Sequence, residues 1–504
     1  MNEQKFQKKI KKFFCTHFFL FFIFFSGPHI FFAQPNEKIV QNYLNTIRDN
    51  TAELTAFFQQ MPKGGDLHHH YSGSIYAETY FDLAVEKNFW LNTKTLEVTE
   101  FKNKSAGTES PDWIQFSDLR KQKTFPSYKE KLLELWSAKD FNGITEPSYK
   151  HFFDAFGHFP HASDSIDLVN GLNELKKRAQ SENVQYIETM FIHPKGKHFE
   201  ASLSYFDDIL HDLQNRKAEK VVGDSLQALT AEILRLTPNF NEDNIALLRK
   251  LKKIHLENNF DDNTFTLRYQ CFVTRFQKPV AMFNEIFNAF YLASSNDLIV
   301  GVNIVAPEHE DVSMNDYWLH CRMFKFCHEL FPNVKYAMHA GELRMGLVKP
   351  EDLTWHIDEA VRVSKANRIG HGVDIATERN VYDLLKYMRN NNVAVELNLV
   401  SNEFILGVKN DAHPIALYKK AGVPIVLCTD DAGVLRTDLT DQFVLLAARY
   451  KNISYKDIKK FVYNSIDYSF IKEQDVKDKL KKQLKDKFNE FEKRVVNWSK
   501  NSNN

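Results

Sequence analysis

Eight strand-like runs alternate with helical patterns along most of this chain of 504 residues, which leaves few folds open to it. Several runs are almost continuously apolar, as parallel strands buried on both faces are. Eight parallel strands with helices between them predict an α/β fold, a (β/α)8 barrel of the TIM type. The runs are residues 66–70, 184–191, 266–274, 297–306, 335–340, 368–372, 393–398 and 424–429.

The segments outside these runs divide into four parts. Residues 34–60 have apolar side chains at helical spacing and predict an N-terminal helical extension. Residues 61–475 are assigned to the barrel, with a polar insertion after the first strand at about 93–125. Residues 476–504 carry one apolar stripe among charged residues, which predicts a C-terminal helix and tail packed on the barrel.

The first 33 residues have the order of a secretory signal peptide. Five lysines precede an almost entirely apolar run at 13–25, and Ser26, Gly27 and Pro28 follow it. The run is shorter than the ~20 apolar residues of a standard membrane-spanning helix, which favours a cleaved signal over an uncleaved anchor. We therefore expect a secreted or periplasmic protein without a stable membrane anchor, cleaved after Ala33.

Charge and cysteine content exclude several classes of protein. The chain has 65 basic and 65 acidic residues, and loss of the leader leaves it slightly acidic. This balance argues against a nucleic-acid partner bound through bulk basicity. The four cysteines beyond the leader match no zinc-ribbon spacing, and their even number would permit a disulfide in an exported protein. Cys271 and Cys428 lie in apolar runs, which favours buried thiols for these two.

Three consecutive histidines end the first run. Successive side chains alternate between the two faces of a strand, so His68 and His70 point to one side and His69 to the other. Two imidazoles on one face are half of a metal site, although the same pair also fits a polar barrel mouth. The pattern becomes informative only together with the ends of other strands.

Three further runs also end in residues with metal-binding or acid-base chemistry. His339 lies at the end of the fifth run with Glu342 just beyond it, His371 lies at the end of the sixth, and Asp430 and Asp431 follow the eighth. Each alone could cap a turn, but catalytic residues of barrel enzymes gather at the carboxyl ends of several strands. The four strand ends together therefore predict one site.

The candidate ligands suit a divalent metal. Three imidazole nitrogens and one carboxylate oxygen fit zinc or another borderline ion, with a position left for water. Such an ion lowers the pKa of its water toward ~7, which makes hydroxide available at neutral pH. Glu342 could then transfer protons and His371 could stabilise the attacking oxygen. These residues predict metal-assisted hydrolysis, with four metal ligands: His68, His70, His339 and Asp430.

Six motifs extend the pattern over roughly residues 55–475. They are MPKGGDLHHHYSG, VQYIETMF, MHAGE, RIGHG, ELNLVSN and HPIALYKKAGVPIVLCTDDAGV. With these motifs in this order, the chain resembles the adenosine deaminase family of the amidohydrolase superfamily. It is most similar to the secreted branch of that family, the adenosine deaminase-related growth factors.

The resemblance implies a reaction and a role for each residue. It implies one Zn²⁺ per chain on the four ligands, and hydrolytic deamination of adenosine or 2'-deoxyadenosine by attack of hydroxide on C6. It implies that Glu342 protonates N1 of the purine and that His371 orients and deprotonates the water. It also implies that Asp431 hydrogen-bonds N7, with Gly73 and Ala306 at the substrate pocket.

Three segments depart from the pattern of the intracellular enzymes. Ser72 replaces an Asp that contacts the ribose, the segment 306–308 (Ala-Pro-Glu) replaces Gly-Asp-Glu, and the segment 431–433 (Asp-Ala-Gly) replaces Asp-Asp-Pro. The identity of the sugar therefore stays open. One alternative is a deaminase of another aminopurine, such as adenine or a modified adenosine. Another is a nucleoside-binding or signalling protein without turnover, which the intact set of catalytic residues disfavours.

Partners and the remaining histidines complete the expectations. A small purine nucleoside is the expected ligand, with no nucleic acid bound, and a homodimer is compatible with the resemblance. His413 precedes Pro414 and is predicted to organise a loop or a helix start rather than to bind metal.

Overall fold

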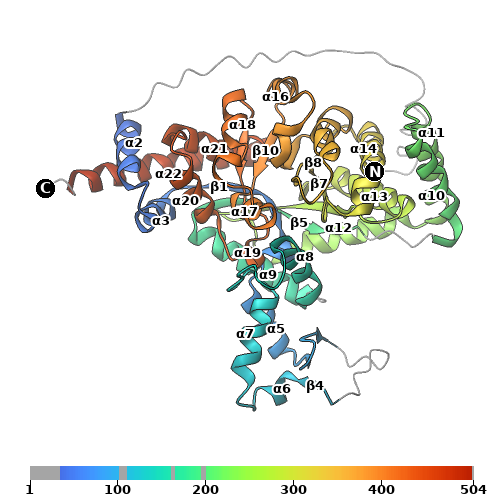
Figure 1. Cartoon of the computed structure of the whole chain (residues 1–504), viewed down its shortest axis with the longest axis horizontal. Helices are drawn as coiled ribbons and strands as arrows, with labels where there is room; N and C mark the ends of the chain where they lie inside the picture. Colours follow the sequence, from blue (N-terminus) through green and yellow to red (C-terminus); the bar gives the residue numbers. More distant parts are fainter. Residues whose placement is uncertain (1–34, 101–110, 161–164, 195–199, 502–504) are drawn as a thin grey trace.

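A computed structural model describes residues 35–100, 111–160, 165–194 and 200–501 of the chain (Figure 1). The signal peptide predicted for residues 1–33 lies outside these ranges, and so does part of the predicted insertion. Of the helices described, none is both long enough and apolar enough to cross a membrane.

Eight parallel strands form the centre of the molecule, in the order β1-β5-β6-β7-β8-β9-β10-β11. All eight predicted strands are present, and the predicted (β/α)8 barrel is confirmed. Their apolar side chains pack inside the barrel and against the helices around it. The strands are β1 (Gly64–His70), β5 (Val184–Ile192), β6 (Thr266–Thr274), β7 (Ile299–Val305), β8 (Lys335–Ala340), β9 (Arg368–His371), β10 (Ala394–Leu397) and β11 (Ile425–Leu427).

The barrel closes between its first and last strands. His69 pairs with Asp430 in an isolated parallel bridge. The Asp430 N–H donates to the His68 carbonyl at 2.9 Å, and the His70 N–H donates to the Asp430 carbonyl at 3.3 Å. The backbone that closes the barrel therefore belongs to three of the four predicted metal ligands.

Helices surround the strands in the order expected of the fold. α13 is buried on most of its surface because it packs against β6, β7, α10 and α14, which explains why its sequence is apolar almost all round. Short helical turns at 350–363 replace a long helix between β8 and β9. The surrounding helices are α9 (Ser165–Ser181), α10 (Glu200–Asn215), α11 (Val222–Leu236), α12 (Phe240–Glu257), α13 (Pro279–Ser295), α14 (Asp311–Leu330), α16 (Val381–Asn390), α17 (Leu399–Leu406) and α18 (Ile415–Ala421).

The first and last helices of the described chain lie together at one side of the barrel (Figure 1). The Asn50 side chain accepts from the Glu53 N–H and caps α3. The Phe57 ring of α3 meets the Phe491 ring of α22 with centroids 5.1 Å apart. These helices are α2 (Pro35–Ile47), α3 (Thr51–Gln60), α20 (Leu439–Arg449), α21 (Tyr455–Asp467) and α22 (Gln474–Asn501).

The segment between β1 and β5 projects from the barrel (Figure 1). Its three short strands form an antiparallel sheet in the order β3-β2-β4. α8 returns to the barrel and packs against α17 and α19 (Ala432–Leu435). The elements are α4 (Tyr71–Ser74), α5 (Ala77–Glu86), β2 (Trp90–Asn92), β3 (Val98–Thr99), β4 (Trp113–Gln115), α6 (Phe116–Leu119), α7 (Phe125–Leu135) and α8 (Ser148–His158).

The four cysteines of the described chain are all buried and free. Cys271 lies in β6 and Cys428 directly follows β11, as expected of small residues in apolar strands. Burial raises the pKa of the Cys321 thiol to about 12, so this group stays protonated at neutral pH.

Candidate active site

The side chains with predicted chemistry meet at the carboxyl ends of β1, β8, β9 and β11. The chain turns sharply at these ends, because Gly341, His371 and Asp430 adopt left-handed backbone conformations with φ of 75°, 66° and 65°. Ala306 does the same at the end of β7, with φ of 83°. Such conformations cost a non-glycine residue ~1–3 kcal/mol and concentrate at functional sites.

The four predicted metal ligands converge on one point. His68 Nε2 and His70 Nε2 lie 3.4 and 3.3 Å from Asp430 Oδ1. His70 Nε2 lies 3.2 Å from His339 Nε2. His68, His339 and Asp430 are almost completely buried, and His70 is partly exposed.

These separations fit a zinc ion. Ligands about 2.0–2.2 Å from a tetrahedral ion lie about 3.3–3.6 Å from one another, and the three separations given above, 3.2 to 3.4 Å, are close to this spacing. Burial would raise the pKa of Asp430, but hydrogen bonds from His68 and His70 hold it well below its usual range. Burial opposes a charge on His68, yet Asp430 and Glu396 raise its pKa to about 10. The cluster therefore favours positive charge at this point, and a metal ion can supply it in place of a proton.

Glu396 sets the orientation and tautomer of His68. Its Oε2 lies 2.7 Å from His68 Nδ1, and its other oxygen accepts from the buried Arg368. Burial would raise the pKa of Glu396, but Arg368 and His68 hold it below its usual value. The carboxylate can only accept a hydrogen bond, so the His68 proton lies on Nδ1 and Nε2 is the nitrogen left for a metal.

A longer chain of hydrogen bonds sets the tautomer of His339. The Arg368 guanidinium binds Glu188 Oε2 at 2.7 Å, and that oxygen accepts from Gln270 Nε2 at 3.0 Å. Gln270 Oε1 then accepts from Asn303 Nδ2 at 3.3 Å. Asn303 Oδ1 is left facing His339 Nδ1 at 3.0 Å. The His339 proton therefore lies on Nδ1, and Nε2 is again free for a metal.

Glu342 is held in a buried turn after β8. The two carboxylate oxygens of Glu308 accept from the Gly341 N–H at 3.2 Å and from the Glu342 N–H at 2.9 Å. Burial, together with the charges of Asp430 and Glu308, raises the pKa of Glu342 well above its usual value. A carboxyl group in this environment carries its proton at neutral pH and can donate it.

His371 lies beside the ligand cluster. Its Nε2 is 3.9 Å from Asp430 Oδ2, and its ring centroid is 4.8 Å from that of His68. Burial lowers the pKa of His371 to about 3 against the opposing charge of Asp430, so the imidazole is neutral at neutral pH. By position alone it could join His68, His339 and Asp430 around a metal ion.

Asp431 and Gly73 are in close contact next to this cluster. Asp431 is buried, and burial together with the charge of Asp430 raises its pKa well above the usual value. A Cβ atom at Gly73 would lie 1.7 Å from Asp431 Oδ1, so glycine is required where α4 passes this carboxyl group. Ala306 is half-buried at the end of β7.

The comparisons with known proteins agree with this geometry. Residues 254–487 match the sequence model of the family described as adenosine deaminase. Just under half of the chain therefore resembles the adenosine deaminase family. The chain is 33% identical over 152 residues to an adenosine deaminase of Plasmodium gallinaceum, covering 30% of this chain and 39% of that protein. It spans about two fifths of the length of the curated relatives it matches first.

Two solved structures share the fold. One is an amidohydrolase of Burkholderia ambifaria with bound Zn, with a TM-score of 0.50, 15% identity and coverage of 88% of this chain and 94% of that chain. The other is the Arabidopsis N6-mAMP deaminase, with a TM-score of 0.51, 18% identity and coverage of 86% and 99%. At these identities, the two structures show only that the fold is shared.

Several residues that support the site were not identified from the sequence. Glu396 and Asn303 orient two of the predicted metal ligands, and Glu308 holds the turn that carries Glu342. Glu396 begins the ELNLVSN motif, and Glu308 ends the segment 306–308 noted above, so both positions carried a signal. Asn303 carried none, because it is one polar residue in an otherwise apolar strand.

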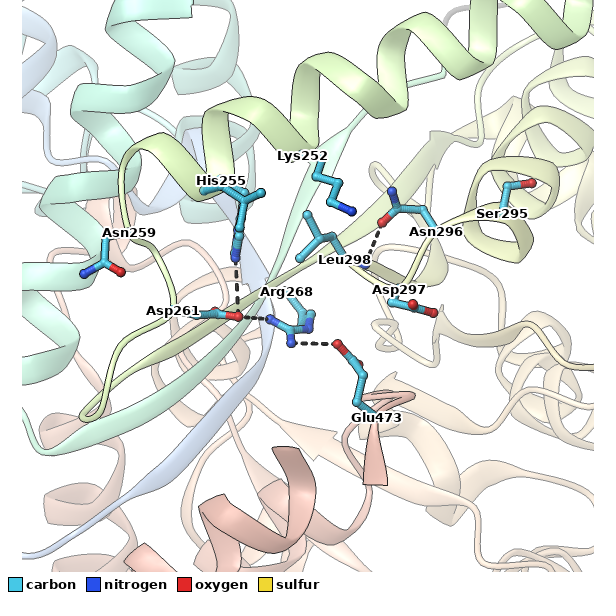
Figure 2. Close-up of a pocket in the computed structure, with 11 residues that line it drawn as sticks. Lys252, His255, Asn259, Asp261, Arg268, Ser295, Asn296, Asp297, Leu298 and Glu473 are labelled. Atoms are coloured by element: carbon cyan, nitrogen blue, oxygen red, sulfur yellow. Dashed lines mark hydrogen bonds and ion pairs between the residues drawn. The ribbon is translucent and has the colours of Figure 1, made fainter. Parts of the chain in front are cut away.

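A pocket of about 410 Å³ lies at the opposite end of the barrel from this site. Figure 2 shows Arg268, near the start of β6, between Asp261 and Glu473, with His255 beside Asp261. Active sites of barrel enzymes lie at the carboxyl ends of the strands, so this amino-terminal pocket is separate from the candidate active site.

The contact between Gly73 and Asp431 predicts a local stability effect. We expect Gly73→Ala to lower the free energy of unfolding by about 1–3 kcal/mol, because a methyl group does not fit against Asp431. Gly157→Ala is the matched control, since its Cβ in α8 would meet nothing within 4 Å. Denaturant unfolding of both variants measures the difference. Equal stability of Gly73→Ala and the unsubstituted protein would show that the contact is not as tight as described.

Proposed function

We propose that the protein is a zinc-dependent hydrolase that converts adenosine or 2'-deoxyadenosine to the corresponding inosine and ammonia. The observation that carries this proposal is the cluster of three imidazoles and one carboxylate beside the buried carboxyl of Glu342. The match of residues 254–487 to the adenosine deaminase model and the similarity to the Plasmodium gallinaceum enzyme support the same chemistry.

One zinc ion per chain would be held by the four ligands. When bound, zinc supplies a Lewis acid that lowers the pKa of water toward ~7. Two of the ligands need no rearrangement on binding, because Glu396 sets the tautomer of His68 and Asn303 sets that of His339. The four ligands are His68, His70, His339 and Asp430.

Three other side chains act on the substrate in this proposal. Glu342 donates its proton to N1 of the purine as hydroxide adds to C6. The C6–N bond then breaks and ammonia leaves with the proton of the new hydroxyl group, while the proton that the attacking water lost returns to Glu342. Asp431 keeps its proton because of its raised pKa, and a protonated carboxyl can donate a hydrogen bond to N7, which is an acceptor. His371 orients the attacking oxygen through Nε2, which has no hydrogen-bond partner within the protein.

The groups described above act on the purine ring, and a nucleotide would present the same ring to them. The Arabidopsis structure is that of an N6-mAMP deaminase, which makes a modified adenosine monophosphate the second substrate to compare.

A substrate panel tests the proposed function. We expect the purified, zinc-loaded protein to deaminate adenosine and 2'-deoxyadenosine faster than adenine, AMP or N6-methyl-AMP, and to lose this activity when zinc is removed by a chelator. Ultraviolet spectra and ammonia release measure the reaction. Binding of adenosine without turnover would identify a nucleoside-binding protein, and faster turnover of another aminopurine would replace adenosine as the substrate.

Replacing the proton donor tests the mechanism. We expect Glu342→Gln to lower kcat/KM by about 10²–10⁴-fold with zinc content unchanged, because the amide cannot transfer a proton. Glu351→Gln is the matched control, since Glu351 is exposed in the next helical turn along the chain. Near-normal turnover by Glu342→Gln would remove this residue from the reaction.

We also propose that the protein is exported and acts in the periplasm or outside the cell. The order of charged, apolar and small residues in the first 33 residues supports this proposal. We expect the protein isolated from its host to begin after Ala33, as measured by mass spectrometry of the amino-terminal peptide. A mature protein that still begins at Met1 would contradict it.

A further inference from the structure

His371 has hydrogen-bond partners on only one of its two ring nitrogens. The Asn402 amide nitrogen Nδ2 lies 3.0 Å from His371 Nδ1, and the Asn398 Nδ2 lies 3.4 Å from the same atom. The remaining polar neighbour of Nδ1 is a carboxyl oxygen of Glu342 at 3.6 Å, which is beyond hydrogen-bond distance. His371 Nε2, on the other side of the ring, faces the proposed metal ligands and has no hydrogen-bond partner among the described residues.

Asn402 connects His371 to a second buried histidine. Its Oδ1 lies 3.1 Å from His413 Nε2, while its Nδ2 meets His371. The backbone N–H of Ile415, the first residue of α18, donates to His413 Nδ1 at 3.3 Å. Asn402 and His413 are both buried, and His413 lies at the start of a helix, as predicted.

The Ile415 N–H fixes which groups donate and which accept along the hydrogen bonds from His413 through Asn402 to His371. A backbone N–H can only donate, so His413 Nδ1 must accept and the His413 proton lies on Nε2. The Nε2–H then donates to Asn402 Oδ1, which leaves the Asn402 amide nitrogen facing His371. Because that NH₂ group also only donates, His371 Nδ1 accepts and the His371 proton lies on Nε2.

If the hydrogen bonds ran in the opposite direction, the one between His413 and the Ile415 N–H would be lost. If His371 carried its proton on Nδ1, the Asn402 amide would have to turn over and present Nδ2 to His413. His413 would then accept at Nε2 and carry its proton on Nδ1, opposite the Ile415 N–H. Two donors would face each other at 3.3 Å in a buried position, which costs about 1–3 kcal/mol for the unmade hydrogen bond.

We infer that Asn402 and His413 are positioning residues that hold His371 as a hydrogen-bond donor through Nε2. This tautomer is the opposite of that of His68 and His339, whose protons lie on Nδ1. A nitrogen that carries a proton cannot bind a metal, so His371 is excluded from the ligand set although it lies within reach of it.

The position of this proton also limits what His371 can do in the reaction, a point that rests on the proposed function. Neutral His371 with its proton on Nε2 donates to the attacking oxygen and stabilises the charge that develops there. It cannot accept the proton of the attacking water through Nε2 in the same state. The family resemblance implied that His371 both orients and deprotonates the attacking water. With its proton on Nε2, His371 keeps the first role but cannot perform the second through this nitrogen.

The tautomer can be observed directly. Long-range ¹⁵N–¹H correlation spectra of zinc-loaded protein labelled with ¹⁵N-histidine distinguish a ring protonated on Nε2 from one protonated on Nδ1, and a His371→Gln spectrum identifies the signals of His371. We expect the Nε2–H form for His371 and for His413. An Nδ1–H form of His371 would overturn the inference whether or not the protein deaminates adenosine.

Two variants of His413 test the direction of the chain by activity. In His413→Gln, Oε1 can accept from the Ile415 N–H and Nε2 can donate to Asn402, so the direction is kept. In His413→Glu, both oxygens only accept, which turns the Asn402 amide over and moves the His371 proton to Nδ1. The Arg449 charge that acts on His413 would compensate the new carboxylate.

We expect His413→Glu to lower kcat by at least about 10²-fold with KM and zinc content almost unchanged, because a misplaced histidine proton removes its contribution to the transition state. His413→Gln should keep kcat close to that of the unsubstituted protein. Equal kcat for the two variants would overturn the inference. If His413→Glu does not fold, the ¹⁵N–¹H spectrum of the unsubstituted protein still shows which nitrogen of His371 carries the proton. If neither the unsubstituted protein nor the variants deaminate adenosine, the proposed function is wrong, and the spectrum still tests the tautomer.

Discussion

A buried guanidinium group with two carboxylates underlies the geometry of the site. Arg368 is fully buried at the start of β9, binds both Glu188 and Glu396, and has its guanidinium carbon 3.5 Å from the centroid of the Phe470 ring. Burying these charges is costly unless each is paired, and removal of one partner of such a group costs ~3–5 kcal/mol. The charges are retained here because each carboxylate directs a hydrogen-bond chain to one metal-binding histidine.

The barrel and the site are built from the same residues. The backbones of His68, His70 and Asp430 close the sheet between β1 and β11, while their side chains form most of the ligand cluster. A change that opens this closure would therefore also separate the ligands. The left-handed conformations at Ala306, His371 and Asp430 turn these strand ends toward the barrel mouth, and the packed barrel around them holds the strain.

The histidines of the site differ in which ring nitrogen carries the proton, not in how close they lie to the cluster. His68, His339 and His371 lie within a few ångströms of one another and are all buried. Two hydrogen-bond chains begin at carboxylates and place the protons of His68 and His339 on Nδ1. A third hydrogen-bond chain begins at a backbone N–H and places the proton of His371 on Nε2. The same residue type is thereby prepared as metal ligand in two positions and as donor in the third.

The sequence by itself determined the eight strands, their parallel arrangement and the residue types at four strand ends, because apolar runs and strand alternation are local properties. The tertiary structure decided which of these residues meet and in which protonation state. Glu396 lies 328 residues from His68, and Asn402 reaches His371 from a different element 31 residues away. Such partners become neighbours only when the barrel closes, and the direction of a hydrogen-bond chain depends on every member, so neither could be read from local pattern.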